Sequence, residues 1–163
     1  MVVFGRIQQT LQYLGVSAKD MKYRFNWNAP IIWSKHEPNT FYHAAQVLLK
    51  TQDMGKTWTE VSPDLTKNDK SKQDTPGVPF TNEAVGAENY GTISYVAESP
   101  NEKGVIWVGT DDGNVWVTED GGANWTNISG TLPNRWVTKV KADPYTANDV
   151  YVTFSGYRYG TNE

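Results

Sequence analysis

The sequence lacks several residue types and patterns on which whole classes of function depend. Its 163 residues include no cysteine, which excludes disulfide bonds and thiolate chemistry and leaves the redox compartment undetermined. Only two histidines occur, His36 and His43, and nothing in their spacing around Pro38 suggests a metal pair, so ordinary strand-end histidines are the better interpretation. We therefore expect no metal and no cofactor.

Long hydrophobic runs and an excess of basic charge are also missing. No apolar stretch approaches the roughly 20 residues that a membrane-spanning helix requires, so no membrane span is predicted. The formal net charge is −3, and the basic residues are scattered along the chain. A nucleic-acid partner would require a basic face, so none is expected. Residues 1–6 also lack the pattern of a signal peptide.

Aromatic residues and turn formers are abundant. Seven Trp, nine Tyr and five Phe accompany fourteen Gly and eight Pro. Aromatic side chains favour strands, and Gly and Pro favour turns, so this composition predicts many short strands rather than a helical bundle. A chain of this length is sufficient for one domain with a sizeable core.

One eight-residue pattern, [Ser/Thr]-x-Asp-x-Gly-x-x-Trp, occurs twice in the chain. Each copy follows an apolar run and precedes a short alternating one, so we interpret it as a strand, a tight turn and a second strand. The fixed positions of the two copies are Thr51, Asp53, Gly55, Trp58, Thr118, Asp120, Gly122 and Trp125.

The residue types of this pattern have a structural explanation that involves no catalysis. A short Asp in a turn can accept hydrogen bonds from backbone N–H groups two or three residues ahead. Gly55 and Gly122 allow the positive φ that such a turn requires. Trp58 and Trp125 begin the next strand, where an indole buries a large area over the hairpin. We interpret the eight positions as structural, with no catalytic residue among them.

Predicted strands recur in the same order along the chain. In each of two units, three strands precede the repeated pattern, which begins at the end of the third strand. A further unit begins after residue 130. Pro100 and Pro144, which occupy equivalent turns, are 44 residues apart. A four-stranded propeller blade typically takes about 40–45 residues. The expected strands are 31–34, 41–44, 47–50, 93–97, 105–109, 115–117, 137–142 and 149–154.

The fold class that follows is all-β, a partial β-propeller of about three four-stranded antiparallel blades. Propellers typically close a ring of about 4–8 blades, so remaining blades or another chain are expected to cover the open edges. The charge run at 67–74 is interpreted as a solvated, disordered loop, and a functional loop is the alternative. The single incomplete domain 1–163 divides into a lead-in with one helical turn at 17–20 (1–29), a blade (30–61), a long polar insertion (62–91), a second blade (92–129) and the start of a further blade (130–163).

The repeated pattern resembles the Asp-box of sialidase-like and sortilin-like β-propellers. Residues 23–31, 62–66, 87–93 and 107–113 are similar to a bacterial family related to the sortilin (VPS10) N-terminal propeller, usually labelled BNR-repeat glycosyl hydrolases. This resemblance implies that the Asp-box lies on the blade edge away from the central pocket. It also implies a larger extracellular or cell-envelope protein. The hydrolase label rests on the repeat, so it carries little information about activity.

An enzyme of the sialidase type would need clustered arginines, a tyrosine nucleophile beside a glutamate, and an acid/base aspartate. None of the four arginines, Arg6, Arg24, Arg135 and Arg158, stands in an Arg-Ile-Pro context. Glu88 and Tyr90 lie two positions apart, and we interpret them as a surface glutamate and a structural tyrosine at the entry to a strand.

An ordinary glycosidase needs two carboxyl groups, about 5–5.5 Å apart for retention or about 6.5–9.5 Å apart for inversion. Asp112 is already explained by its hairpin turn, so Asp111 is the favoured candidate. The full set of candidate carboxylates is Asp111, Asp112, Glu83, Glu88 and Glu98.

The function expected from these observations is that of a non-catalytic propeller section. It would bind a protein or glycan ligand, or serve as a scaffold; the alternative is a glycoside hydrolase whose site is completed by missing blades. Exposed aromatic rings could stack on sugar rings or grip a peptide, because flat rings bury much area at little entropic cost. The aromatic candidates are Trp27, Trp33, Tyr90 and Trp136.

Overall fold

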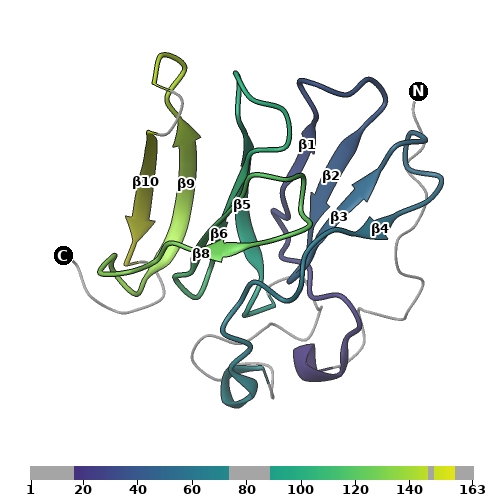
Figure 1. The fold of residues 1–163 in the computed structure, drawn as a ribbon. Helices are drawn as coiled ribbons and strands as arrows, with labels where there is room; N and C mark the ends of the chain where they lie inside the picture. Colours follow the sequence, from purple (N-terminus) through teal and green to yellow (C-terminus); the bar gives the residue numbers. More distant parts are fainter. Residues whose placement is uncertain (1–16, 74–88, 147–148, 157–163) are drawn as a thin grey trace.

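Three antiparallel β-sheets lie side by side in the computed structural model of the chain, which describes residues 17–73, 89–146 and 149–156 (Figure 1). The first two sheets have four strands each, and the third has two among the described residues. Within each sheet, every strand pairs with the next along the chain, as expected for blades formed by meanders. The prediction of an all-β partial propeller is confirmed.

The strands lie within one or two residues of the positions that the sequence predicts. The first sheet has the order β1 (Ile31–Trp33), β2 (Phe41–Ala44), β3 (Leu48–Thr51) and β4 (Thr59–Glu60). The second has the order β5 (Ile93–Glu98), β6 (Ile106–Thr110), β7 (Val115–Thr118) and β8 (Thr126–Asn127). The third pairs β9 (Trp136–Ala142) with β10 (Val150–Ser155).

Two short 3-10 helices accompany the sheets, η1 (Ala18–Asp20) and η2 (Lys70–Lys72). The first was expected from the sequence, and the second lies in the charge run that was expected to be a solvated loop. Asp69 caps η2 by accepting a hydrogen bond from the Ser71 N–H. Each helix is three residues long, so neither is able to span a membrane.

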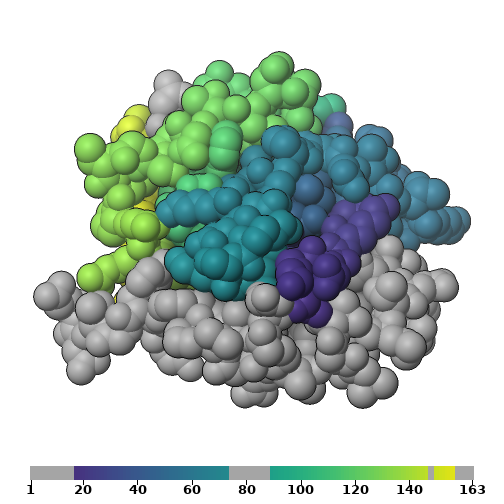
Figure 2. Space-filling view, turned by 90° about the horizontal axis from the view of Figure 1, so that it is seen from below, coloured from purple at the N-terminus to yellow at the C-terminus, as the bar shows by residue number. Residues whose placement is uncertain are grey.

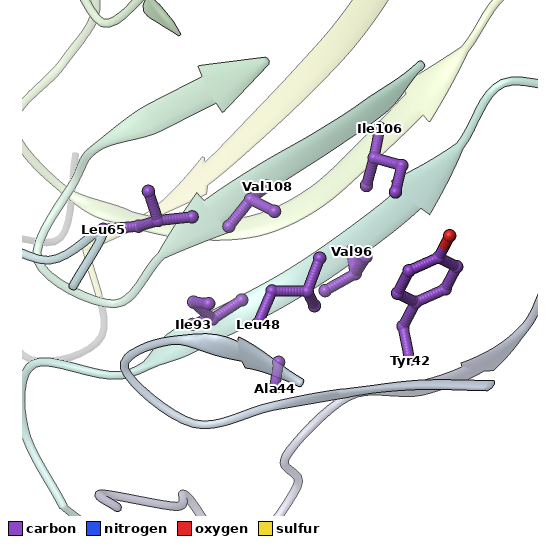
Figure 3. Packing of buried hydrophobic residues seen from close by; sticks show 8 residues of the cluster. All are labelled: Tyr42, Ala44, Leu48, Leu65, Ile93, Val96, Ile106 and Val108. Atoms are coloured by element: carbon purple, nitrogen blue, oxygen red, sulfur yellow. The ribbon is translucent and has the colours of Figure 1, made fainter. Parts of the chain in front are cut away.

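A hydrophobic core joins the first sheet to the second (Figure 3). In strands, alternate side chains point to the same face, and the faces that meet here are apolar. Leu65, from the insertion, also enters this core and is completely buried. The contributing residues are Tyr42, Ala44, Leu48, Leu65, Ile93, Val96, Ile106 and Val108.

A second core joins the second sheet to the third. Val105, Trp107 and Val115 of the second sheet pack here with Val137 and Val140 of β9. The sheets approach so closely that a Cβ added to Gly109 would lie 2.3 Å from a methyl carbon of Val137. A glycine is therefore required at this crossing for steric reasons.

The lead-in and the insertion both pack against the sheets. The Phe25 ring of the lead-in stacks on His43 of β2, with ring centroids 4.8 Å apart. In the insertion, the Lys67 N–H donates to the Asp112 carboxylate at 2.7 Å, and Gln73 is completely buried. Figure 2 shows residues 62–73 in teal beside the purple start of the described chain, where the Lys19 N–H donates to the Gln73 carbonyl. Residues 64–73 are thus ordered against the blades, contrary to the disordered loop expected for 67–73; residue 74 lies outside the described residues.

Candidate binding groove

The first repeated loop connects β3 to β4 and is organised by a threonine and an aspartate. The Asp53 carboxylate accepts hydrogen bonds from the Thr57 N–H at 2.8 Å and the Thr57 hydroxyl at 2.7 Å. The Thr51 hydroxyl donates to Asp53 at 2.8 Å and accepts from the Gly55 N–H at 2.9 Å. One carboxylate and one hydroxyl therefore satisfy the backbone N–H groups of the tight turn.

The second repeated loop, between β7 and β8, has the same set of hydrogen bonds. The Asp120 carboxylate accepts from the Asn124 N–H at 2.9 Å and from the Asn124 side-chain amide at 2.7 Å. The Thr118 hydroxyl donates to Asp120 at 2.8 Å and accepts from the Gly122 N–H at 3.0 Å. In these threonine and aspartate hydrogen bonds the two loops differ only in the side chain that supplies the last donor, a threonine in one and an asparagine in the other.

These hydrogen bonds favour the ionised aspartates. The backbone N–H and hydroxyl of Thr57 lower the pKa of Asp53 to about 2. The backbone N–H and side-chain amide of Asn124 lower the pKa of Asp120 to about 2. Neither carboxylate is therefore suited to act as a proton donor near neutral pH.

Positive φ angles occur at both pattern glycines, 85° at Gly55 and 106° at Gly122, as the sequence predicts. The two tryptophans are half-buried and differ in their partners. The Trp58 indole N–H donates within its own loop to the Gly55 carbonyl at 3.2 Å. The Trp125 indole N–H donates to the Val61 carbonyl at 2.9 Å, beside the first sheet. The second tryptophan therefore links two blades.

The candidate carboxylates within the described residues are buried and hydrogen-bonded. Asp111 accepts from the N–H groups of Gly91 and Thr92 and from the Thr92 hydroxyl. Asp112 accepts from the Thr110 hydroxyl and from the Lys67 N–H, and burial raises its pKa. Each holds turns together, so neither is an accessible catalytic acid in this structure. Glu83 and Glu88 lie outside the described residues.

The residues considered for a sialidase-type site are not brought together in the described chain. Arg24 is almost fully buried and pairs with Asp64 at 2.7 Å. Tyr90 is also buried, with 3% of its surface exposed, so its expected role as an exposed aromatic is wrong. Its ring lies within 5.4 Å of the Lys72 ammonium. Arg6 and Arg158 lie outside the described residues.

The two histidines make separate hydrogen bonds. His36 Nε2 lies 2.8 Å from the Ser99 carbonyl oxygen, and His43 Nδ1 lies 2.9 Å from the Pro30 carbonyl oxygen. Burial lowers the pKa of His43. Among the residues that the structure describes, no three His, Asp or Glu side chains are grouped to hold a metal ion.

A groove runs along the first strand of each sheet. In the described chain β1, β5 and β9 each lie at an edge of their sheets, and β5 lies against both β1 and β9. Two adjoining hollows, of about 320 and 380 Å³, share Ile32, Tyr95 and Val96 in their linings. The groove therefore follows β5, with β1 on one side and β9 on the other.

Exposed aromatic and apolar side chains are concentrated at the β1 side of this groove. Trp33 lines the groove and is 62% exposed, and its ring packs at 5.1 Å on Phe41. Ile31 also lines the groove and is 48% exposed. Trp27, four residues before Ile31 in the chain, is 69% exposed. Trp27 and Trp33 are thus exposed as expected, whereas Trp136 is half-buried.

Two lysines that the sequence analysis did not select also line the groove. Lys35 follows β1 and Lys141 lies on β9, and both are exposed. Glu98, one of the candidate carboxylates, also lines the groove but is buried, and its carboxylate accepts from the Ser34 hydroxyl at 2.8 Å and the Lys35 N–H at 2.6 Å. Alignment of the first strand of each predicted blade would have been the only sequence signal for this grouping.

No family model matches the sequence, and no curated protein matches it either. Among solved structures, the crystal structure of an ancestral GH74 enzyme is similar over 81% of this chain and 14% of its own, with a TM-score of 0.55 and 15% identity. The shared fold is that of part of a β-propeller. YCF48 from Cyanidioschyzon merolae matches over 80% of this chain and 51% of its own, at 19% identity and a TM-score of 0.20. The chain thus spans a small part of the first neighbour and about half of the second.

Proposed function

We propose that the chain is a non-catalytic section of a β-propeller that binds a protein or carbohydrate ligand in the groove along β1, β5 and β9. The observation that carries this proposal is the exposed Trp33 ring, which lines the groove and is held by Phe41. A large ring already fixed by a neighbour loses little conformational freedom when a ligand covers it.

The repeated loops have a structural role in this proposal. Thr51, Asp53, Gly55 and Trp58 hold the turn between β3 and β4, and Thr118, Asp120, Gly122 and Trp125 hold the turn between β7 and β8. The hydrogen bonds of both loops support this assignment. None of the eight residues lines the two hollows of the groove. They would therefore stabilise the blades without contacting a ligand.

We also place the section in a larger extracellular or cell-envelope protein, as the resemblance of the repeated pattern implies. Remaining blades, or another chain, would cover the surfaces that the three sheets leave open. Ile31 is an exposed apolar residue at the edge of the first sheet, which supports such a contact close to the groove.

Binding is tested by titrating the chain with panels of glycans and extended peptides, comparing the parent with Trp33→Ala. We expect at least one ligand whose affinity falls about tenfold or more in the variant, as for a central aromatic contact. Tyr145→Ala is the matched control, because Tyr145 is 94% exposed but does not line the groove. Absence of any ligand, or equal losses in both variants, would contradict the proposal.

Hydrolysis is the outcome that would replace this function by the glycoside hydrolase alternative. Asp111→Asn and Glu88→Gln are the informative variants if turnover of aryl glycosides is detected. Turnover that either substitution abolishes, while the fold is retained, would establish a catalytic role. The burial of Asp111 and its three hydrogen bonds are the reason that we expect no such turnover.

A further inference from the structure

The third sheet has an open edge at the position where the other two sheets continue. In the first two sheets the second strand pairs on its far side with a third strand, β2 with β3 and β6 with β7. β10 is the second strand of the third sheet, and within the described chain it pairs with β9 alone, at the left-hand end of Figure 1. Such an edge offers backbone N–H and C=O groups to which another strand can add.

The turn before β10 identifies the backbone groups that point to this edge. The Asp143 N–H donates to the Asp149 carbonyl at 2.9 Å. In an antiparallel pair, residues that bond to the partner strand alternate with residues whose N–H and C=O groups point away from it. Asp149 is of the first kind, and the register continues unbroken from it to Thr153. Val150 and Val152 therefore direct their backbone groups away from β9.

The first two sheets show what pairs at the equivalent positions. In all three sheets the residue just before the second strand accepts the same turn hydrogen bond at 2.9 Å, so these strands can be aligned position by position. Val150 is then equivalent to Phe41 of β2 and Ile106 of β6. Phe41 lies opposite Thr51, and Ile106 lies opposite Thr118. Each partner is the first residue of the repeated pattern, so a strand added to β10 would end in the same pattern.

The repeated loop of the second sheet also contacts the sheet before it. The Trp125 indole N–H donates to the carbonyl of Val61, the residue that follows β4. A Cβ added to Gly122 would lie 2.4 Å from the same carbonyl oxygen. The loop therefore lies directly on Val61, whose side chain packs against the first core.

The position equivalent to Val61 on the second sheet is Ile128, which follows β8. The Ile128 N–H donates to the Val115 carbonyl, just as the Val61 N–H donates to the Leu48 carbonyl, both at 2.9 Å. Ile128 is 37% exposed. An exposed apolar residue thus stands where the repeated loop of a following sheet would lie, on the side of the second sheet that faces β9 and β10.

We propose that the β10 edge and Ile128 form a docking site for a β-hairpin of another polypeptide chain, with the pattern [Ser/Thr]-x-Asp-x-Gly-x-x-Trp between its strands. Its first strand would pair antiparallel with β10, and its indole N–H would donate to the Ile128 carbonyl. Val150 and Val152 pack against the second core, so an apolar residue opposite Val152 would extend that core. The inference rests on the part of the proposed function in which another chain supplies blades, and the ligand groove plays no part in it.

A second copy of this chain fits the site less well. The sequence contains the pattern twice, and both hairpins, β3–β4 and β7–β8, already complete sheets of their own. Two copies could pair β10 with β10, but no repeated loop would then cover Ile128. The occupant must therefore bring a hairpin that is not already part of a sheet.

The probe is a synthetic peptide of residues 113–129, which contains β7, the second repeated loop and β8. At saturating peptide, we expect hydrogen exchange at the Val150 and Val152 amides to slow about tenfold or more, because pairing protects the N–H groups. A peptide with Trp125→Ala should bind about threefold or more weakly, since it lacks the indole that covers Ile128. Unchanged exchange at both amides in the folded chain would overturn the inference.

Variants of the chain test the two halves of the site by fluorescence anisotropy of the labelled peptide. Val152→Pro removes an N–H that points to the open edge, where an edge strand tolerates proline, and should abolish binding. Ile128→Ala should weaken binding about threefold or more, because it removes apolar surface that the peptide would bury. Ile31→Ala is the matched control, an exposed isoleucine of the first sheet, and should bind as the parent does.

The remaining outcomes separate this inference from the rest of the proposed function. If Val152→Pro lowers the unfolding midpoint, Ile128→Ala and the Trp125→Ala peptide decide the test, and unchanged affinity in both overturns the inference. Sedimentation of the chain alone tests the second copy: a dimer that Val152→Pro dissociates would also overturn it. Trp33→Ala should bind the peptide as the parent does, so the glycan and peptide panels test the ligand groove independently.

Discussion

Asp53 and Asp120 illustrate how a single side chain can set the conformation of a loop. Each accepts a hydrogen bond from the backbone N–H four residues ahead, from the side chain of that residue and from the preceding threonine hydroxyl. An asparagine could accept some of these bonds but lacks the charge that strengthens all of them. The pattern in the sequence therefore specifies a carboxylate for a physical reason that is local to the turn.

Acid should weaken the fold through these two carboxylates. Their folded pKa values of about 2 lie below the model-compound value of 3.8, so ionisation favours the folded state. This contribution is complete above about pH 4 and is lost as the pH falls through about 2. We expect the free energy of unfolding, measured in urea, to decrease over this interval.

The double variant Asp53→Asn, Asp120→Asn is the control for this prediction. It should be less stable than the parent near neutral pH and should lose less stability on acidification. A pH dependence identical to that of the parent would contradict the pKa assignment. Asp143→Asn tests specificity, because Asp143 has a lowered pKa through its own turn N–H donors but belongs to neither repeated loop.

At the scale of elements, the spacing between the second and third sheets depends on the absence of one side chain. Gly109 of β6 faces Val137 of β9, and a Cβ on Gly109 would overlap it at 2.3 Å. Gly109→Ala should therefore destabilise the chain by about 1–3 kcal/mol through overpacking. Urea unfolding would measure this change.

A double-mutant cycle provides the control for this steric explanation. Val137→Ala alone should destabilise the chain because Val137 is fully buried. Combined with Gly109→Ala, the smaller side chain makes room for the new methyl group, so the double variant should lose less than the sum of the two single losses. If the losses of the two single variants simply add in the double variant, a clash with Val137 does not explain the destabilisation caused by Gly109→Ala.

The two pattern tryptophans should differ in their contribution to stability. Trp125 is half-buried, packs on the core between the first two sheets and donates to the Val61 carbonyl. Trp125→Ala should cost about 2–3 kcal/mol, less than the ~3–5 kcal/mol typical of a buried tryptophan. Trp125→Phe keeps most of the ring and removes the donor, so it should cost about 1 kcal/mol.

Trp58 provides the comparison, because its hydrogen bond stays within its own loop. Trp58→Ala should destabilise the chain less than Trp125→Ala, since no contact between blades depends on its N–H group. Thermal unfolding of the two alanine variants measures this order. Equal losses would mean that the bond from Trp125 to the first sheet contributes little.

At the scale of the whole molecule, Arg24 connects three parts of the chain that are distant in sequence. It lies in the lead-in, pairs with Asp64 of the insertion at 2.7 Å, and donates to the Gly91 carbonyl before the second blade at 3.0 Å. The guanidinium is almost fully buried, so its charge depends on the carboxylate. The Arg24 side chain therefore joins the lead-in to both ends of the insertion.

Removing the carboxylate should therefore destabilise the whole fold. Asp64→Asn leaves the Arg24 charge buried without a counter-ion, and we expect a loss of about 2–3 kcal/mol, reduced from the fully buried case because Asp64 is partly exposed. Lys103→Gln is the control, since Lys103 is 65% exposed and its pair with Glu37 should contribute less than about 1 kcal/mol. Chemical denaturation that ranks the two variants in the opposite order would contradict this assignment.

Open surfaces of the three-sheet section also differ in character. The face of the third sheet turned away from the second carries Lys139, Lys141, Tyr151 and Thr153, all exposed. The first sheet instead exposes Ile31 and Trp33 beside the lead-in. A second copy stacked head to tail would bury lysines against an apolar face, which is unfavourable. Any partner that covers the first sheet must therefore present a different surface.

The strands and turns followed from the sequence because they depend on neighbours a few residues apart. Alternating apolar residues, the Asp-Gly hairpin at 112–113 and the positive φ at Gly55 and Gly122 are all local properties, and the structure agrees with each. The ordered part of the insertion was missed because the burial of Leu65 and Gln73 depends on segments distant in sequence: Leu65 enters the core between the first two sheets, and the Gln73 carbonyl accepts from Lys19 of the lead-in.

Which aromatic rings face solvent, and which side chains share a groove, was decided by tertiary packing alone. Tyr90, which precedes a predicted strand, and Trp33, which lies in one, were both expected to be exposed, yet one is 3% and the other 62% exposed. Exposure depends on what other segments place over a ring, and periodicity carries no information about that. The approach of Lys35 and Lys141 to one groove likewise requires two blades to lie on either side of a third. The sequence determined the strands and turns of each blade, and only the packing of the blades determined which side chains line the groove along them.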